Sequence, residues 1–145
     1  MKPNSLLAFL FTLIAILVII IGVGINFLFS LQPSTQNCDG YDLFLFPDSN
    51  KLDTVIGQGQ ILKIRAINAG SFGDKYNVIL KGPEWAVVKP TLFGLRAEES
   101  KTLFLYVSPN VGNEGKYTLD LTVKSNCISQ STTIEVGVLP RVNQD

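Results

Sequence analysis

The sequence contains no histidine, and its 12 basic residues are balanced by 12 acidic residues. The lack of histidine removes the most common general base and metal ligand, and it excludes Ser-His and Cys-His nucleophile pairs. The zero net charge supplies no basic surface for nucleic acid. We therefore expect no enzyme activity, no cofactor, no metal site and no nucleic-acid partner.

Charged residues are also missing between Lys2 and Asp39. Within this interval, residues 6–31 are almost all Leu, Ile, Val, Phe or Ala. As a helix rising about 1.5 Å per residue they would extend roughly 39 Å, which exceeds the ~30 Å hydrocarbon core of a bilayer. The sequence thus predicts one transmembrane helix over 6–31, in contact with membrane lipid.

A cleaved signal peptide is the main alternative to this anchor. Signal peptides have an apolar run of about 7–15 residues that ends in a small-residue cleavage site. Here the run is longer, and its exit, residues 29–33, has no Ala-x-Ala pattern. The residues before Cys38 also lack the apolar position of a lipoprotein cleavage site. An uncleaved signal-anchor is favoured, and N-terminal processing stays open.

The charges that flank the span set its expected orientation. Lys2 precedes it, whereas Asp39 and Asp42 follow it. The positive-inside tendency then places residues 1–5 in the cytoplasm and the rest of the chain outside. Residues 32–40, which include the helix stop Pro33, form a linker. We expect a single-pass protein of the cell membrane with an extracytoplasmic C-terminal domain.

After the linker, the hydrophobic pattern changes to alternation along short segments. Gly, Pro, Asn and Asp separate these segments, and no helical period is present, which is typical of an all-β sandwich. The expected strands cover residues 41–46, 61–67, 76–80, 87–88, 102–107, 117–123 and 132–139. We predict two antiparallel sheets of about seven strands over 41–140, followed by a C-terminal tail, 141–145.

A series of short motifs in this region resembles immunoglobulin-like envelope modules of the CARDB and NPCBM-associated type, over about residues 58–125. The motifs are Asn68-x-Gly70, Tyr76-x-Val78-x-Leu80, Gly82-Pro83-x-Trp85, Pro90, the turn Glu98–Ser100, Val107-Ser108-Pro109 and Gly115-x-Tyr117. The resemblance implies an adhesion, spacer or carbohydrate-associated domain of archaeal or bacterial envelopes. The glycine usual before the acidic turn is replaced by Arg96-Ala97, which implies a different loop shape there.

Two cysteines fall on the expected outer side of the membrane. Cys38 precedes the first strand, and Cys127 lies in the last turn. Because strand direction alternates in a sandwich, both positions are at one end of the domain, together with the loops at 70–73 and 126. We predict a structural disulfide, with free thiols or an intermolecular bridge as alternatives. Those loops are then expected to face the bilayer or a membrane partner.

The remaining polar and aromatic candidates are given structural interpretations. Tyr117 occupies the place of a tyrosine corner, whose hydroxyl bonds to nearby backbone. Trp85 is interpreted as a cover on the edge of the core. Asp48, Asn50 and Asp53 lie in one loop but are too few for a calcium site, so we interpret them as a solvated turn. Glu98 and Glu99 are adjacent and form a polar turn rather than a catalytic pair.

Three functions are compatible with this sequence. The leading hypothesis is a structural or protein-interaction role in the cell envelope, or as an accessory subunit of a membrane complex. The outline resembles the single-span stator proteins of the archaellum. Strand addition at a sheet edge is the expected contact mode, and a homo-oligomer is compatible with it. The alternatives are a pilin- or archaellin-like filament subunit and a carbohydrate-binding module with contacts at Trp85, Tyr41 or Tyr76.

Overall fold

The computed structural model describes residue 10 and residues 13–14, 16–18 and 37–141. The chain divides into two compact units, 1–36 and 37–145. In the first unit, the described residues are helical. No helix within the described residues is long and apolar enough to cross a membrane. The predicted tail 1–5 and most of the predicted span 6–31 lie outside the described residues.

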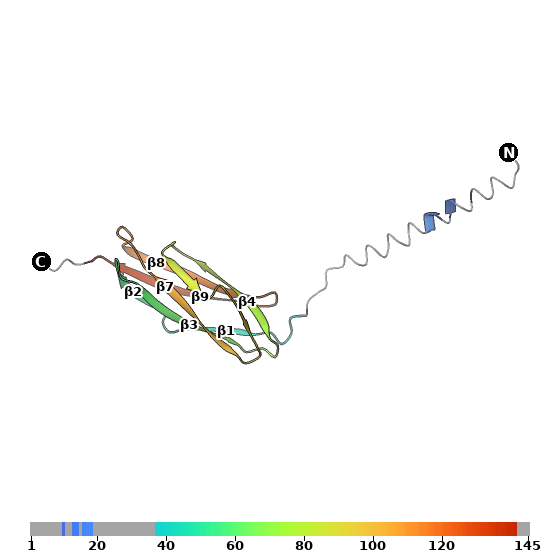
Figure 1. Ribbon diagram of the computed structural model, residues 1–145, viewed down its shortest axis with the longest axis horizontal. Coiled ribbons are helices and arrows are strands. Elements are labelled where there is room, and N and C mark those ends of the chain that lie inside the picture. The colour runs from blue at the N-terminus through green and yellow to red at the C-terminus, as the bar shows by residue number, and fades with distance from the viewer. Residues whose placement is uncertain (1–9, 11–12, 15, 19–36, 142–145) are drawn as a thin grey trace. The chain divides into compact units, whose positions relative to one another are not determined.

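The second unit is a two-layered β-sandwich (Figure 1). One sheet has the strand order β1-β3-β7-β5 and the other has the order β2-β9-β8-β4-β6. The strands are β1 (Leu43–Pro47), β2 (Lys51–Val55), β3 (Gln60–Asn68), β4 (Asp74–Lys81), β5 (Ala86–Lys89), β6 (Leu92–Leu95), β7 (Ser100–Val107), β8 (Gly115–Lys124) and β9 (Ser129–Leu139). The prediction of an all-β sandwich is confirmed.

Nine strands are present in the described residues, where the sequence predicted about seven. The two additions are β2 and β6, which the chain forms on the five-stranded sheet when it leaves the four-stranded sheet after β1 and again after β5. The prediction that all strands are antiparallel is also wrong, because β2 pairs in parallel with β9. Asp53, expected in a loop, therefore lies in β2. Both missed strands are short, and β6 contains Gly94.

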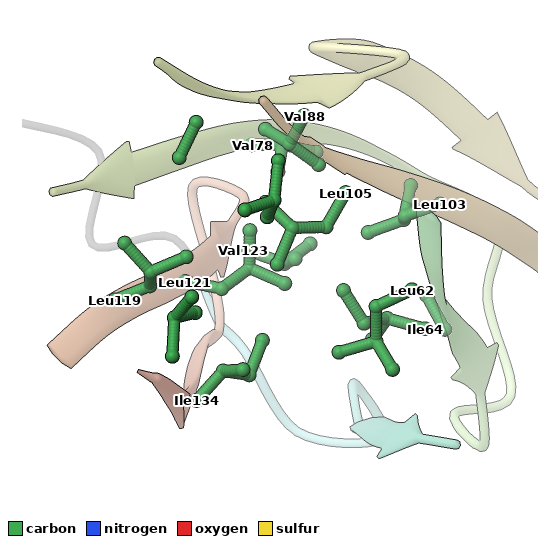
Figure 2. Close-up of a cluster of buried hydrophobic side chains, with 14 of the residues drawn as sticks. Leu62, Ile64, Val78, Val88, Leu103, Leu105, Leu119, Leu121, Val123 and Ile134 are labelled. Atoms are coloured by element: carbon green, nitrogen blue, oxygen red, sulfur yellow. The ribbon is translucent and has the colours of Figure 1, made fainter. Parts of the chain in front are cut away.

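The core is formed by the inward side chains of the alternating strands. Leu62 and Ile64 of β3 and Leu121 of β8 are examples, each at most 6% exposed. Figure 2 shows these side chains gathered between the two sheets with others from β4, β5, β7 and β9. The alternation predicted for β3, β8 and β9 is confirmed, since each of these strands buries one face only.

A buried asparagine organises two loops at one end of the sandwich. The Asn68 side chain, which has no exposed surface, donates from Nδ2 to the carbonyl oxygens of Phe72 (2.8 Å) and Arg96 (3.0 Å). Its Oδ1 accepts from the Gly70 amide at 3.0 Å. Its backbone carbonyl also accepts from Glu98, which has φ of 62°. Asn68 therefore ties the β3–β4 loop to the β6–β7 loop.

The predicted disulfide closes the same end. Cys38 and Cys127 are bonded, with their Cα atoms 5.1 Å apart, a usual separation for a disulfide. The bridge joins the segment before β1 to the turn between β8 and β9. Gly70 lies against the same segment, because a Cβ atom there would come within 2.5 Å of the Gly40 carbonyl oxygen. The prediction that Cys38 and Cys127 are neighbours at one end is confirmed.

Candidate functional site

The outer face of the four-stranded sheet is aromatic. In β1 and β7 the apolar residues run through both alternating sets of positions, so one set faces the core and the other faces outward. Leu43 and Leu103 point inward and are buried. Phe44, Phe46 and Tyr106 point outward and are 42–47% exposed. A sheet face of this kind differs from the polar outer face that an antiparallel sheet usually presents to water.

We call this surface the aromatic face, and it comprises Phe44, Phe46, Ile61, Val87, Phe104 and Tyr106. The registers of β3 and β5 with β7 place Ile61 and Val87 on either side of Tyr106. The rings pair along the strands, with centroid distances of 6.2 Å for Phe44–Phe46 and 6.5 Å for Phe104–Tyr106. The apolar side chains thus extend across all four strands of the sheet.

Basic side chains are interspersed with the aromatic rings. Lys63 and Arg65 of β3 and Lys89 of β5 lie at outward, exposed positions. The Arg65 guanidinium carbon is 5.9 Å from the centroid of the Phe46 ring, within the range of a cation–π contact. Asp48 borders the shallow hollow that Phe46, Lys63 and Arg65 help to line. The face is therefore apolar with a cationic component.

The outer face of the five-stranded sheet is polar by contrast. Thr133 Oγ1 donates to Asp120 Oδ1 at 2.9 Å, and the Thr122 and Ser131 hydroxyls are also 2.9 Å apart. The outward positions of β4, β8 and β9 carry no aromatic residue. Its exposed apolar residues, Ile79, Leu92 and Leu139, are aliphatic and lie on three different strands. The continuous aromatic face therefore distinguishes one side of the sandwich.

The two edges of the four-stranded sheet are poor sites for strand addition. At the β1 edge, the backbone amide of Leu43 points away from β3 and donates to Asp42 Oδ1 at 2.9 Å. Pro47, at the end of the same strand, has no N–H to offer. At β5, the amide of Ala86 donates to the Pro83 carbonyl at 3.0 Å, and Pro90 follows the strand. Proline and local hydrogen bonds are common protections of edge strands.

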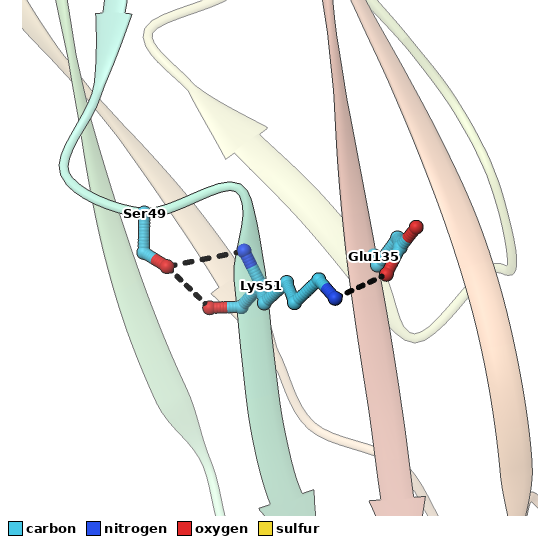
Figure 3. Close-up of polar contacts among 3 residues, drawn as sticks. All are labelled: Ser49, Lys51 and Glu135. Carbon is cyan, nitrogen blue, oxygen red and sulfur yellow. Dashed lines mark hydrogen bonds and ion pairs between the residues drawn. The ribbon is translucent and has the colours of Figure 1, made fainter.

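The β2 edge of the other sheet is protected by a serine (Figure 3). Ser49 Oγ accepts from the Lys51 amide at 3.1 Å and donates to the Lys51 carbonyl at 2.7 Å. The Lys51 ammonium group also lies 3.4 Å from Glu135 Oε2 on β9. This exposed ion pair is worth at most about 1 kcal/mol, but the charges discourage an incoming strand.

Trp85 and Tyr117 lie together at the edge of the core. Their rings meet edge to face with centroids 4.9 Å apart, and both are partly buried against the core. Trp85 lies in the β4–β5 connection and Tyr117 in β8. The hydrogen bond of a tyrosine corner stays a prediction, whereas the ring contact shows how Trp85 and Tyr117 can act as structural residues.

The three aromatic residues proposed for sugar contact do not form one surface. Tyr76 has no exposed surface, so that part of the hypothesis is wrong. It faces inward because alternation places it with Val78 on the core side of β4. Tyr41 precedes β1 and its ring lies 5.6 Å from that of Phe72, while Trp85 is at the opposite end of β4.

We expect Tyr76→Phe to stabilise the fold by about 1 kcal/mol, because the buried Tyr76 hydroxyl has no hydrogen-bond partner among the described residues. Burial, followed by the charges of Asp74 and Asp42, raises the pKa of Tyr76 to about 12. The unfolded chain loses the Tyr76 proton at about pH 10, whereas the folded chain keeps it until about pH 12. The wild-type fold is therefore most stable below pH ~10 and loses stability as pH rises through about 12. Thermal unfolding at pH 8 and 11 tests both effects. The advantage of the variant should grow with pH, and a constant difference would contradict the linkage.

Comparisons with known proteins identify the fold of the domain but do not assign the chain to a family. The sequence matches no protein-family model and no curated protein. Among solved structures, native α2-macroglobulin of Escherichia coli is 19% identical with a TM-score of 0.56. The match covers 68% of this chain but only 7% of that protein. The chain thus corresponds to a small part of that molecule.

Two other solved structures match over most of their own length. The PapD-like domain 7 of human CEP192 is 11% identical, with a TM-score of 0.53 and coverage of 79% of this chain and 94% of that domain. A FixG-related protein from Vibrio parahaemolyticus is 14% identical, with a TM-score of 0.51 and coverage of 69% and 97%. These likenesses confirm an immunoglobulin-like β-sandwich. The CARDB and NPCBM-associated type stays a prediction.

Proposed function

We propose that this chain is an extracytoplasmic interaction domain, tethered to the cell membrane by residues 6–31, and that it binds a protein partner through the aromatic face. The observation that carries the proposal is the set of six outward apolar side chains across one sheet, five of them exposed and Phe104 partly buried, beside three basic ones. Contiguous apolar patches on a folded domain mark interaction sites, and aromatic residues and arginine are enriched in protein interfaces.

The shape of the surface favours a protein over a lipid partner. Phe44, Phe46 and Tyr106 are each more than half covered, because their rings lie against their neighbours on the sheet. They lie on strands β1 and β7 and do not project from a loop. A flat surface with half-covered rings instead suits another folded surface of matching shape. The partner would complete the burial of this face.

The proposal is tested by site-specific photocrosslinking of the full chain in membranes of the cell that produces it. A benzophenone amino acid replaces Phe104 on the aromatic face, and the matched control replaces Thr118 on the polar face. We expect a discrete crosslinked protein from position 104 only, with at least a fivefold loss on Phe46→Ser combined with Tyr106→Ser. These residues are not in the core, so the fold should be retained.

Two results would contradict the proposal. Equal crosslinking from positions 104 and 118 would show that the aromatic face has no preferred partner. Release of the full chain from washed membranes by alkaline carbonate would contradict the part of the proposal that tethers the chain to the membrane through residues 6–31. The carbohydrate hypothesis is not favoured, because Trp85, Tyr41 and Tyr76 do not form one surface. The filament hypothesis rests on residues 1–31, most of which lie outside the described residues.

A further inference from the structure

The β6 edge differs from the other three sheet edges. The Val78 amide donates to the Thr91 carbonyl at 2.8 Å, which fixes the alternation of hydrogen bonds between β4 and β6. Phe93 consequently directs its amide and carbonyl toward β4, whereas Leu92 and Gly94 direct theirs to the open side. Among the described strands β6 is paired with β4 alone, and none of these four groups bonds to a turn or loop of the described residues.

This edge also lacks the protections found elsewhere. The segment Leu92-Phe93-Gly94-Leu95 contains no charge and no proline. Leu92 is 63% exposed, the highest value among the outward apolar residues of the described strands. An open strand edge without charge or proline is a template for pairing with another strand. The edge is only four residues long, so its occupant must match it closely.

We propose that β6 pairs with β6 of a second copy of this chain, in antiparallel orientation, with Leu92 opposite Gly94 of the second copy. In this register Phe93 of one copy lies opposite Phe93 of the other, on the two-fold axis. Leu92 of each copy then lies opposite Gly94 of the other. Opposed residues that exchange both hydrogen bonds are the hydrogen-bonded pairs of an antiparallel ladder. The two open amides and two open carbonyls of each copy are then all satisfied, and the two five-stranded sheets become continuous.

The side chains of the edge are complementary in the same register. Leu92 and Gly94 both lie on the outer face of the sheet. The Leu92 side chain of each copy would cover Gly94 of the other, where the absence of a side chain leaves room. A Cβ atom on Gly94 would have the Lys75 Cγ at 3.9 Å, so the incoming leucine would also contact the aliphatic part of Lys75.

Charge does not oppose this pairing. Arg96, the first charged residue beyond β6, falls opposite Pro90 of the second copy and not opposite another cation. A second copy also explains why an uncharged sequence is tolerated at an exposed edge. The alternative occupant, an unrelated strand, would gain the hydrogen bonds but not the mutual fit of Leu92 and Gly94.

The symmetry of the pair places a constraint on tethered copies. The two-fold axis is perpendicular to the five-stranded sheet, so the strands of the two copies run in opposite directions. Two chains tethered to one membrane would therefore lie with their sheets parallel to it. The pairing leaves the aromatic face free, because that face belongs to the other sheet.

The proposal is tested by disulfide crosslinking of the full chain in detergent micelles. Two variants, Leu92→Cys and Gly94→Cys, are oxidised separately and as an equal mixture. Opposed positions have Cα atoms about 5.5 Å apart, within disulfide range, whereas two copies of the same position would be roughly 8–9 Å apart. We expect the mixture to give at least fivefold more crosslinked dimer than either variant alone. A mixture of Lys51→Cys and Asp53→Cys, at the protected β2 edge, should show no such excess.

A charge variant provides the second measurement. Leu92→Lys should convert the dimer to a monomer in sedimentation at matched detergent density, whereas Val87→Lys on the other sheet should not. The proposal is overturned if the cysteine mixture gives no excess, if the β2 control gives the same excess, or if the wild type is monomeric. A dimer that survives Leu92→Lys would also contradict the proposal, because that dimer would be held by another part of the chain, such as the apolar segment 6–31. None of these results would affect photocrosslinking at position 104, so the proposed function is tested separately.

Discussion

Replacement of both Cys38 and Cys127 with serine should lower the free energy of unfolding by about 4–5 kcal/mol. The bridge joins positions separated by 89 residues, and a crosslink that closes so long a loop removes much conformational entropy from the unfolded chain. For a domain of this size, the loss corresponds to a fall of roughly 20 °C or more in the midpoint of thermal unfolding. Fluorescence of Trp85, the only tryptophan, reports the transition.

A reductant supplies the control for this experiment. Dithiothreitol should lower the midpoint of the wild-type chain by a similar amount and should leave the double serine variant unchanged. A loss below about 1 kcal/mol in the variant would show that the unfolded chain is already restricted without the bridge. An effect of dithiothreitol on the variant would show that the reductant acts elsewhere.

Asn68→Ala should cost about 3 kcal/mol of unfolding free energy. The substitution leaves the Phe72 and Arg96 carbonyls and the Gly70 amide without their buried partner, and each such loss costs about 1–3 kcal/mol. Asn68→Asp should be no better, because a carboxylate cannot donate to the two carbonyls. Both loops depend on the same side chain, so the damage is not confined to one segment.

Asn77→Ala is the matched control for Asn68. Asn77 lies on β4 with an exposed side chain, so its replacement should change stability by no more than about 0.5 kcal/mol. Both variants are compared with the wild type by thermal unfolding of the full chain in detergent. Equal midpoints for Asn68→Ala and the wild type would mean that other groups satisfy the two loops. Rescue by Asn68→Asp would show that the accepting oxygen matters more than the donors.

The sequence was sufficient to predict the elements with strong alternation and clear ends. Strands β3, β8 and β9 bury one face each, so their period was visible without a structure. The disulfide was also predictable, because alternating strand direction places the start of the first strand beside the last turn. Strands β2 and β6 were missed because they have only five and four residues, too few to show a clear alternation, and β6 contains Gly94.

The candidate site was less visible in the sequence. The apolar runs in β1 and β7 occupy both sets of alternating positions, and this was the available signal for an exposed aromatic face. Nothing in one sequence says which set faces the core. The role of Asn68 and the state of each sheet edge also depend on which backbone groups meet in space. Sequence patterns report burial better than they report hydrogen-bond partners.

The position of the Cys38–Cys127 bridge determines how the domain would bear mechanical load. Tension applied along the chain from residue 37 reaches Cys38 before it reaches β1, and the bridge passes it to the β8–β9 turn. The pull then acts on the β8–β9 hairpin, whose ten residue pairs make it the longest of the described residues. Without the bridge, the same pull would peel β1 from β3 one hydrogen bond at a time.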